Sequence, residues 1–225
     1  MCGRYSLIVT DDLGARFRVY DPLIGLRSQF NVTPGREMPV VHDGAEPGME
    51  CMVWGLVPFW AHDPSIGRKL INARAETVAE KPAFRASFAK KRCLVPASGF
   101  YEWKSEKGEK VPFYYQLEGG GHFAFAGLFD TWHDPAGGER RTFVIITTDV
   151  NALVGKIHDR MPVILHREDE EAWLDGESDP GLLENLLAPF PAEEMAGYRV
   201  STKVNNPENE GADLIEPQEK GRTWW

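Results

Sequence analysis

The 225-residue sequence lacks the features of a membrane or secreted protein. No stretch approaches the ~20 consecutive apolar residues of a membrane-spanning helix, and the N-terminus has no apolar run typical of a secretion signal. Cysteine is scarce: there are three, none in a Cys-x-x-Cys pair, and this odd number indicates reduced thiols rather than a disulfide framework. These absences predict a soluble, cytoplasmic protein without a membrane partner.

Motifs for nucleotide-binding loops and metal sites are also missing. The sequence has no Gly-x-Gly-x-x-Gly motif and no P-loop lysine, and its six histidines show no His-Glu-x-x-His spacing. The zinc deaminase signature, His-x-Glu with Pro-Cys-x-x-Cys, is absent. We therefore predict no metal and no cofactor.

The net charge of −9 is unevenly distributed. Residues 167–225 carry 5 basic and 15 acidic side chains, whereas the first 166 residues carry 20 and 19. Within that first part, residues 68–110 hold 11 basic and 5 acidic side chains. A local basic excess favours phosphate binding, although an ordinary solvated face has the same composition.

The hydrophobic pattern predicts one α+β domain with a mixed, mainly antiparallel sheet. A hydrophobic content of 42% supports one sizeable core, and 22 glycines and 16 prolines are typical of many short elements. Apolar runs between turn residues predict these strands: Cys51–Leu56, Arg92–Pro96, Phe113–Leu117, Phe123–Phe129, Thr142–Thr148 and Met161–Leu165. The predicted helices are Thr10–Phe17, Ala75–Lys91, Asp149–Ile157, Arg167–Leu174 and Pro180–Leu187, and Glu118–Gly121 is a predicted hairpin turn. Strands and helices do not alternate regularly, which disfavours a Rossmann-type parallel sheet.

The second residue, directly behind the initiator Met1, is a cysteine. If Met1 is removed, Cys2 carries a free α-amine with a pKa of ~7.7–8. At neutral pH a fraction of the molecules therefore has an uncharged amine, and this form attacks aldehydes. The adjacent thiol then closes onto the imine carbon as a thiazolidine, because intramolecular closure is strongly favoured. Taken alone, an accidental cysteine at a frayed terminus is the better explanation.

The segment Asn72–Glu76 places an amide, a guanidinium and a carboxylate at alternate positions. In an extended segment Asn72, Arg74 and Glu76 share one face. The amide can hydrogen-bond a sugar hydroxyl or a phosphate, and the guanidinium can bind a phosphate through two hydrogen bonds. The competing interpretation is a polar edge strand with a surface ion pair between Arg74 and Glu76.

Glu102 lies between two aromatic residues, Tyr101 and Trp103, after an apolar strand. Apolar surroundings raise the proton affinity of a carboxylate and suit it to acid or base chemistry near neutral pH, while Trp103 offers a stacking face for a base. Alternatively, the aromatics belong to the core and Glu102 faces water. Cys93 and Cys51 are interpreted as small buried hydrophobes.

His158 and Arg160 follow the predicted helix Asp149–Ile157, at an element boundary where sites often form. His158 is a candidate proton shuttle and Arg160 a candidate phosphate ligand. An equally good local explanation is a histidine that caps the helix C-terminus. Further upstream, the segment Val53–Trp60 predicts a core strand that ends in an aromatic tip, where Trp60 is either a wedge beside unstacked bases or part of the core.

Several segments, in order along the whole chain, together resemble one family, SRAP (SOS response-associated peptidase), in its compact bacterial form. The segments are Met1–Arg4, Asn31–Pro34, Trp54–Pro58, Asn72–Glu76, Gly99–Trp103, Phe125–Leu128, His158–Pro162 and Val204–Asn205. The resemblance implies a single α+β domain around a barrel-like sheet, spanning residues 1–225 with a core of about 2–217 and a short C-terminal tail.

The resemblance also implies a function: recognition of abasic sites in single-stranded DNA, with a thiazolidine crosslink through Cys2. Asn72 matches the amide that aligns the amino terminus and the sugar, Glu102 the acid and base of ring opening, and His158 the histidine of proton transfer. The matching DNA contacts are Arg74, Arg160 and Trp103, with Arg4 beside the nucleophile and Trp60 at the aromatic tip. The family name reflects a proposed peptidase activity that includes removal of Met1.

The partner implied is single-stranded, replication-associated DNA, bound by a monomer in the bacterial nucleoid. Two other functions remain open from the residues. A peptidase with Cys2 as nucleophile would turn over peptides without DNA. A non-catalytic reader of damaged or modified bases would bind DNA reversibly and would be indifferent to Glu102→Ala.

Overall fold

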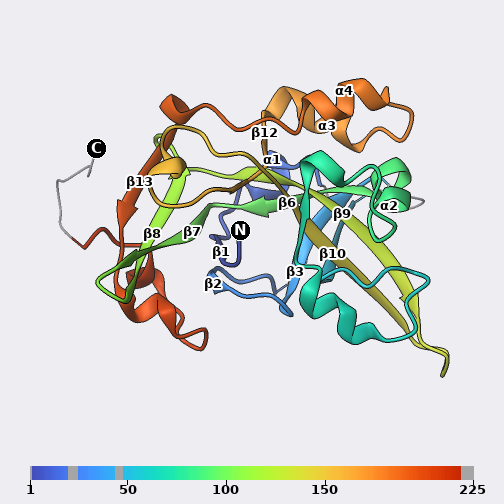
Figure 1. Cartoon of the computed structure of the whole chain (residues 1–225), viewed down its shortest axis with the longest axis horizontal. Helices are drawn as coiled ribbons and strands as arrows, with labels where there is room; N and C mark the ends of the chain where they lie inside the picture. The colour runs from blue at the N-terminus through green and yellow to red at the C-terminus, as the bar shows by residue number, and fades with distance from the viewer. Residues whose placement is uncertain (1, 20–24, 44–47, 219–225) are drawn as a thin grey trace.

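Five strands that carry most of the apolar sequence close into a barrel (Figure 1). The computed structural model describes residues 2–19, 25–43 and 48–218. Around the barrel the order is β10 (Glu139–Thr148), β4 (Gly48–Trp54), β3 (Glu37–His42), β6 (Arg92–Ala97) and β9 (Phe123–His133), which pairs again with β10. The pairing of β10 with β4 is parallel and the others are antiparallel. The predicted α+β class with a mixed, mainly antiparallel barrel is thereby confirmed.

A second sheet, entirely antiparallel, lies against the barrel (Figure 1). Its order is β13 (Met195–Arg199), β8 (Glu109–Leu117), β7 (Gly99–Glu106), β1 (Tyr5–Leu7) and β2 (Gln29–Val32). Strands β7 and β8 form a long hairpin whose turn residues Lys107 and Gly108 have φ angles of 49° and 87°. This left-handed pair is the geometry of a tight hairpin turn and favours glycine at the second position.

Three short strands complete the barrel sheet. β5 (Asn72–Arg74) runs parallel to β10, and the predicted strand Met161–Leu165 divides into β11 (Met161–Pro162), paired with β10, and β12 (Ile164–Leu165), paired with β9. The predicted hairpin at Glu118–Gly121 is wrong. Strands β8 and β9 on its two sides belong to different sheets, so this glycine-rich segment is a crossing between sheets.

The helices are shorter than predicted. The α-helices are α1 (Leu13–Arg16), α2 (Arg85–Lys90), α3 (Glu170–Leu174) and α4 (Pro180–Asn185). The predicted helix Ala75–Lys91 is wrong over its first half, because Pro82 disfavours helix at the residue before it. The predicted helix Asp149–Ile157 is reduced to one 3-10 turn, because the Asn151 side chain accepts from the backbone amides of Leu153 and Val154 instead.

The remaining turns are 3-10 helices: η1 (Pro64–Lys69), η2 (Ala75–Thr77), η3 (Val154–Lys156), η4 (Arg167–Asp169), η5 (Ala192–Glu194), η6 (Thr202–Asn205) and η7 (Ala212–Leu214). None of the helices described is long and apolar enough to cross a membrane. The predicted boundary of the core near residue 217 remains a prediction, and most of the predicted tail lies outside the described residues.

Aromatic side chains fill the space between the two sheets. Tyr5 packs edge-on against Trp54 and Phe125, with ring centroids 5.2 and 5.8 Å apart, and Phe100 stacks on Tyr115 at 5.2 Å. All five are buried. This cluster ties β1, β7 and β8 to the barrel.

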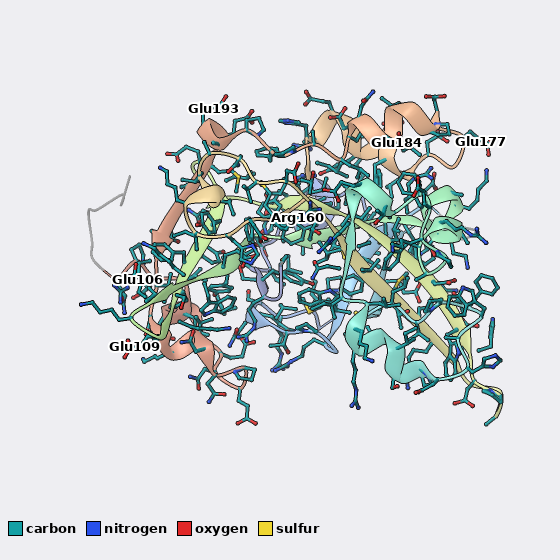
Figure 2. All side chains as sticks on the ribbon, in the orientation of Figure 1. Glu106, Glu109, Arg160, Glu177, Glu184 and Glu193 are labelled. Carbon is teal, nitrogen blue, oxygen red and sulfur yellow. The ribbon has the colours of Figure 1, made fainter. Side chains whose placement is uncertain are left out.

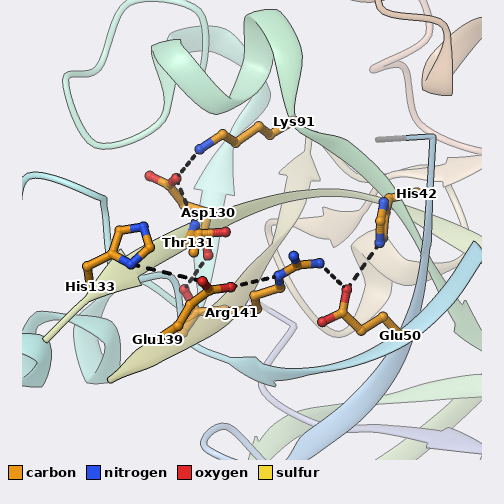
Figure 3. Close-up of polar contacts among 9 residues, drawn as sticks. His42, Glu50, Lys91, Asp130, Thr131, His133, Glu139 and Arg141 are labelled. Atoms are coloured by element: carbon orange, nitrogen blue, oxygen red, sulfur yellow. Dashed lines mark hydrogen bonds and ion pairs between the residues drawn. The ribbon is translucent and has the colours of Figure 1, made fainter. Parts of the chain in front are cut away.

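A row of charged side chains crosses the barrel surface (Figure 3). Arg141 of β10 pairs with Glu50 of β4 and with Glu139, and Glu50 also lies 3.3 Å from His42 of β3. These contacts bridge the barrel's parallel strand pair, β4 and β10, and therefore support its closure.

Candidate active site

The register of β1 against β7 places the N-terminus beside Glu102. Tyr5 pairs with Phe100, and the amide of Tyr101 donates to the carbonyl of Arg4 at 3.0 Å. Continuing this antiparallel register brings the residues before Arg4 alongside Glu102. Cys2 is fully buried there, and its thiol is held near the Arg4 carbonyl at 4.0 Å.

Asn72 fixes the chain at Cys2 from the barrel side. Strand β5 is held parallel to β10 with Asn72 opposite Ile145, and the Asn72 side-chain amide donates to the Cys2 carbonyl at 2.8 Å. The Oδ1 atom of Asn72 is buried and accepts no hydrogen bond from the residues that the structure describes. The predicted alignment of the N-terminus by Asn72 therefore has a direct geometric counterpart.

Glu102 is 3% exposed, on the inner face of β7. Burial, helped by the negative charge of Asp159, raises the pKa of Glu102 to about 8. Burial, with the nearby Glu102 charge, also raises the pKa of the Cys2 thiol well above its ordinary value. At neutral pH the site therefore holds a neutral thiol beside a carboxylic acid ready to exchange its proton, and the interpretation that Glu102 faces water is wrong.

His158 faces Glu102 from the loop after η3. Its Nε2 atom lies 3.8 Å from a Glu102 oxygen, while its Nδ1 atom lies 3.1 Å from the Arg160 amide and 2.9 Å from the Asp159 carboxylate. Burial lowers the pKa of His158, so the neutral ring predominates at neutral pH. In the neutral ring Nδ1 accepts from the Arg160 amide, which leaves the Nε2 proton toward Glu102.

Arg4 and Trp103 are joined to the chain around them. The Arg4 guanidinium donates to the side chain of Asn31 at 2.6 Å and to the carbonyl of Val204 at 2.7 Å, and it lies over the Trp103 ring at 5.4 Å. The Trp103 indole donates to Asn205 at 2.7 Å. Asn31 and Asn205 are thus site-supporting residues that we did not single out from the sequence, although both lie in the motifs shared with the family.

The two predicted phosphate-binding arginines differ. Arg74 is exposed and forms no ion pair within the described part of the chain. Arg160 is enclosed: it pairs through both terminal nitrogens with Glu76, lies 3.1 Å from Asp149 and donates to the Thr147 carbonyl at 2.7 Å. The interpretation that Arg74 pairs with Glu76 is wrong, because Glu76 is paired with Arg160 instead.

Trp60 lies at an exposed aromatic tip, the loop of residues 57–61, where Trp60 is 45% and Phe59 56% exposed. This resolves the choice between core and surface in favour of the surface. The loop is held by the β9–β10 hairpin through three hydrogen bonds: Val57 amide to Thr142, Phe59 amide to Asp130, and Trp132 indole to the Ala61 carbonyl. The tip is therefore rigidly presented, and no described contact joins it to Cys2.

The cations of residues 68–110 do not form one surface. Arg92 is buried and donates to backbone carbonyls of both α2 and the α3 region, while Lys90 and Lys91 pair with Glu177 and Asp130. Figure 2 labels Glu177 and Glu184 at the acidic end of the molecule, the end formed by α3 and α4, well apart from Arg160. Arg92 and Lys90 therefore hold the acidic C-terminal part onto the core, and Lys91 pairs within the barrel.

The other thiols and the histidines form no second centre. Cys93 is buried as predicted, whereas Cys51 is only partly buried, because its strand β4 lies near the barrel surface. Within residues 2–19, 25–43 and 48–218, no group of three or more histidine, cysteine, aspartate or glutamate side chains is arranged to hold a metal ion.

The barrel with its packed second sheet brings Cys2, Asn72, Glu102 and His158 together beside the end of β1. The chain belongs to the SRAP family, since the family model described as SOS response associated peptidase (SRAP) matches residues 1–207.

Relatives and a solved structure agree with this assignment over nearly the whole chain. The abasic site processing protein YoqW of Bacillus subtilis is 43% identical, over 96% of this chain and 99% of that protein. The abasic site processing protein YedK of Escherichia coli is 31% identical, over 96% of this chain and 100% of that protein. A crystal structure of a Bacteroides thetaiotaomicron protein superimposes with a TM-score of 0.88 at 32% identity. The match covers 96% of this chain and 99% of that one.

Proposed function

We propose that this protein captures abasic sites in single-stranded DNA by forming a thiazolidine through Cys2 after Met1 is removed. The observation that carries the proposal is the convergence of buried Cys2 and Glu102 with Asn72 and His158 around the end of β1. The names of the relatives, which process abasic sites, support the same substrate.

The state of the two nucleophilic groups sets the order of steps. Because the pKa of the buried Cys2 thiol is raised, the sulfur is neutral at neutral pH and is a weak first nucleophile. The α-amine, once uncovered, attacks the C1′ aldehyde of the opened sugar, and loss of water gives an imine. The sulfur then bonds to the imine carbon and its proton passes to the nitrogen, which completes the thiazolidine.

Glu102 and His158 supply the proton transfers. A closed abasic sugar must open before an amine can react, and opening requires a proton at the ring oxygen. Glu102, with a pKa of about 8, still holds that proton at neutral pH. The anomeric hydroxyl releases a proton as C1′ becomes the aldehyde, and that proton restores the Glu102 acid. His158, 3.8 Å from Glu102, lies beside this exchange.

Arg74 and the aromatic tip are exposed groups suited to contact a DNA strand. Arg74 lies two residues after Asn72 on β5 and is an exposed cation with no ion pair to any described residue, which suits it to a phosphate. Trp60 presents a flat face suited to a flanking base. Arg160 and Arg4 are already occupied by protein partners, so we assign them first to holding the site and only secondarily to DNA. Each chain carries all the reacting groups, which supports action as a monomer on replication-associated DNA.

The peptidase alternative is less well supported. A cysteine nucleophile in a peptidase acts as a thiolate, and burial opposes ionisation of Cys2. A reversible reader of damaged bases has no use for a buried acid whose pKa is near 8.

The test is crosslinking of abasic single-stranded DNA on a denaturing, heat-treated gel, together with the intact mass of the protein. We expect the mass to lack one methionine and the parent to form a heat-stable adduct. Cys2→Ala should lose it and Cys51→Ala, a matched change of a partly exposed cysteine, should keep it. Retained Met1 in the crosslinking population, or full stable crosslinking by Cys2→Ala, would overturn the proposal.

A further inference from the structure

The phenol of Tyr115 is a buried hydrogen-bond donor that makes no hydrogen bond within the described part of the fold. Tyr115 is fully buried on β8, and its hydroxyl has no hydrogen-bond partner among the residues that the structure describes. Buried polar groups without partners are rare in folded proteins, so each one calls for an explanation.

The strand register directs this phenol toward the reacting groups. On the β7–β8 hairpin Phe100 pairs with Tyr115 and Glu102 pairs with Phe113. Residues two apart on a strand share a face, so Tyr115 and Glu102 are diagonal neighbours on the inner face. A long aromatic side chain reaches its diagonal neighbour in an antiparallel pair.

Electrostatics agree with this geometry. Burial raises the pKa of Tyr115, and the charge of Glu102 raises it further. The phenol therefore keeps its proton over the working pH range and is always a donor, never a competing anion. A neutral donor beside a carboxyl group stabilises the ionised form of that group.

We propose that Tyr115 is a positioning residue for Glu102, whose phenol donates to the Glu102 carboxylate as that group releases its proton to the sugar. The inference rests on the proposed function, because it assigns Glu102 the proton transfer. The phenol limits how far burial opposes ionisation of Glu102, so that the acid releases its proton during ring opening instead of retaining it.

Other titratable groups that face Glu102 come from separate elements. They are the Cys2 thiol, and His158 and Asp159 in the loop before β11. Removal of Met1 would add the Cys2 amine to this set. None of them lies on β8, so a change of Tyr115 alone leaves them in place.

The neighbouring residue Tyr114 provides a matched control. It lies on the same strand with its side chain on the opposite face, and its hydroxyl is 2.7 Å from the Ser6 hydroxyl. Tyr114→Phe therefore breaks a buried hydrogen bond and should lower the melting temperature. Tyr115→Phe removes only an unpartnered hydroxyl, so the melting temperature should stay the same or rise.

The experiment titrates Glu102 by NMR of carboxyl-labelled glutamate, with Glu102→Gln identifying the signal, and measures crosslinking rate at saturating abasic DNA. In Tyr115→Phe we expect the Glu102 midpoint to rise by about one pH unit from about 8, and the rate to fall about tenfold. Tyr114→Phe should change neither. A 3-fluorotyrosine at position 115, a stronger donor, should move the midpoint down.

An unchanged midpoint and rate in Tyr115→Phe, or a midpoint unmoved by 3-fluorotyrosine, would overturn the inference. The two proposals fail separately. If the parent does not crosslink at all, the proposed function fails, while the Glu102 titration still reports whether Tyr115 donates to it.

Discussion

Burial of Glu102 raises the proton affinity of its carboxyl group and also makes the folded protein less stable when that group must ionise. The pKa of Glu102 is about 8 in the folded protein against 4.5 for an ordinary glutamate, chiefly because burial disfavours the charged form. Between these two pH values the unfolded chain has released a proton that the folded chain retains. Stability therefore falls as the pH rises through this window.

Replacement of Glu102 by glutamine should remove this pH dependence. We expect Glu102→Gln to gain stability relative to the parent by on the order of 1 kcal/mol for each pH unit between about 4.5 and 8, while crosslinking is lost. Urea unfolding at several pH values measures the difference. Glu109→Gln, an exposed change on β8, is the control. Parallel stability curves for the parent and Glu102→Gln would contradict the assignment.

Asn72 acts on position more than on stability. Its amide holds the Cys2 carbonyl at 2.8 Å, so Asn72→Ala should leave the cysteine present but poorly aligned. We expect crosslinking at saturating DNA to slow by about tenfold or more, the loss expected from misplaced reacting atoms, with a small change in melting temperature. Asn185→Ala, which removes an exposed amide on α4, away from Cys2, should retain the rate. Equal rates in both variants would argue against alignment by Asn72.

At the scale of elements, the aromatic tip depends on a buried carboxylate. Asp130 of β9 is 2% exposed and accepts from the Phe59 amide at 2.8 Å, from Lys91 at 2.6 Å and from the amide of Thr131 at 2.9 Å (Figure 3 shows the last two residues). The carboxylate thus fixes the backbone from which Trp60 projects.

Asp130→Ala should loosen this loop. Leaving buried donors without an acceptor costs on the order of 2 kcal/mol, which lowers the melting temperature of a chain this long by roughly 4–8 °C. Hydrogen exchange of peptides that cover residues 57–61 should accelerate, and binding of single-stranded DNA should weaken. Asp134→Ala, in the exposed turn of the same hairpin, should alter none of these. Unchanged exchange in Asp130→Ala would show that the tip is held by its other contacts.

The strands that sequence predicts best are those whose environment is uniform. The apolar runs of β6, β9 and β10 are buried along most of their length. Each predicted strand shares at least one end with the observed strand and differs by a few residues at the other. Strand β7 was missed because its second half, toward Glu106, is polar and projects into solvent on the hairpin. Strand β13 was missed because it pairs only with β8 and alternates weakly.

The candidate site shows the same division. Cys2, Asn72, Glu102 and His158 carry recognisable chemistry, and the sequence identifies them. Their neighbour Tyr115 does not stand out, because its role depends on the register of β7 against β8, which places it diagonal to Glu102. The pairing of Arg160 with Glu76, 84 residues earlier, was likewise not predictable from local spacing.

At the scale of the whole molecule, a large part of the negative charge, on α3, α4 and the turns beside them, lies away from the proposed DNA face. Glu170 of α3 pairs with Arg16 at 2.6 Å, and Arg92 holds the backbone of the same region. The acidic helices α3 and α4 lie together at one end of the molecule (Figure 1). A net charge of −9 is therefore compatible with local attraction of a DNA strand, provided that a few cations near Cys2 remain unpaired.

This arrangement predicts that few phosphates are neutralised and that Arg74 is one of the main contributors. Binding of single-stranded DNA should weaken with salt, with a shallow slope, and Arg74→Gln should reduce that slope by about 0.7, the value for one phosphate contact on a single strand. Fluorescence anisotropy at several salt concentrations, on undamaged single strands of different sequence, measures it without interference from crosslinking. Lys90→Gln removes a cation paired with Glu177 at the acidic end and should leave the slope unchanged. If both variants shift the slope equally, DNA is drawn by the overall charge of the protein and not by a defined face beside Cys2.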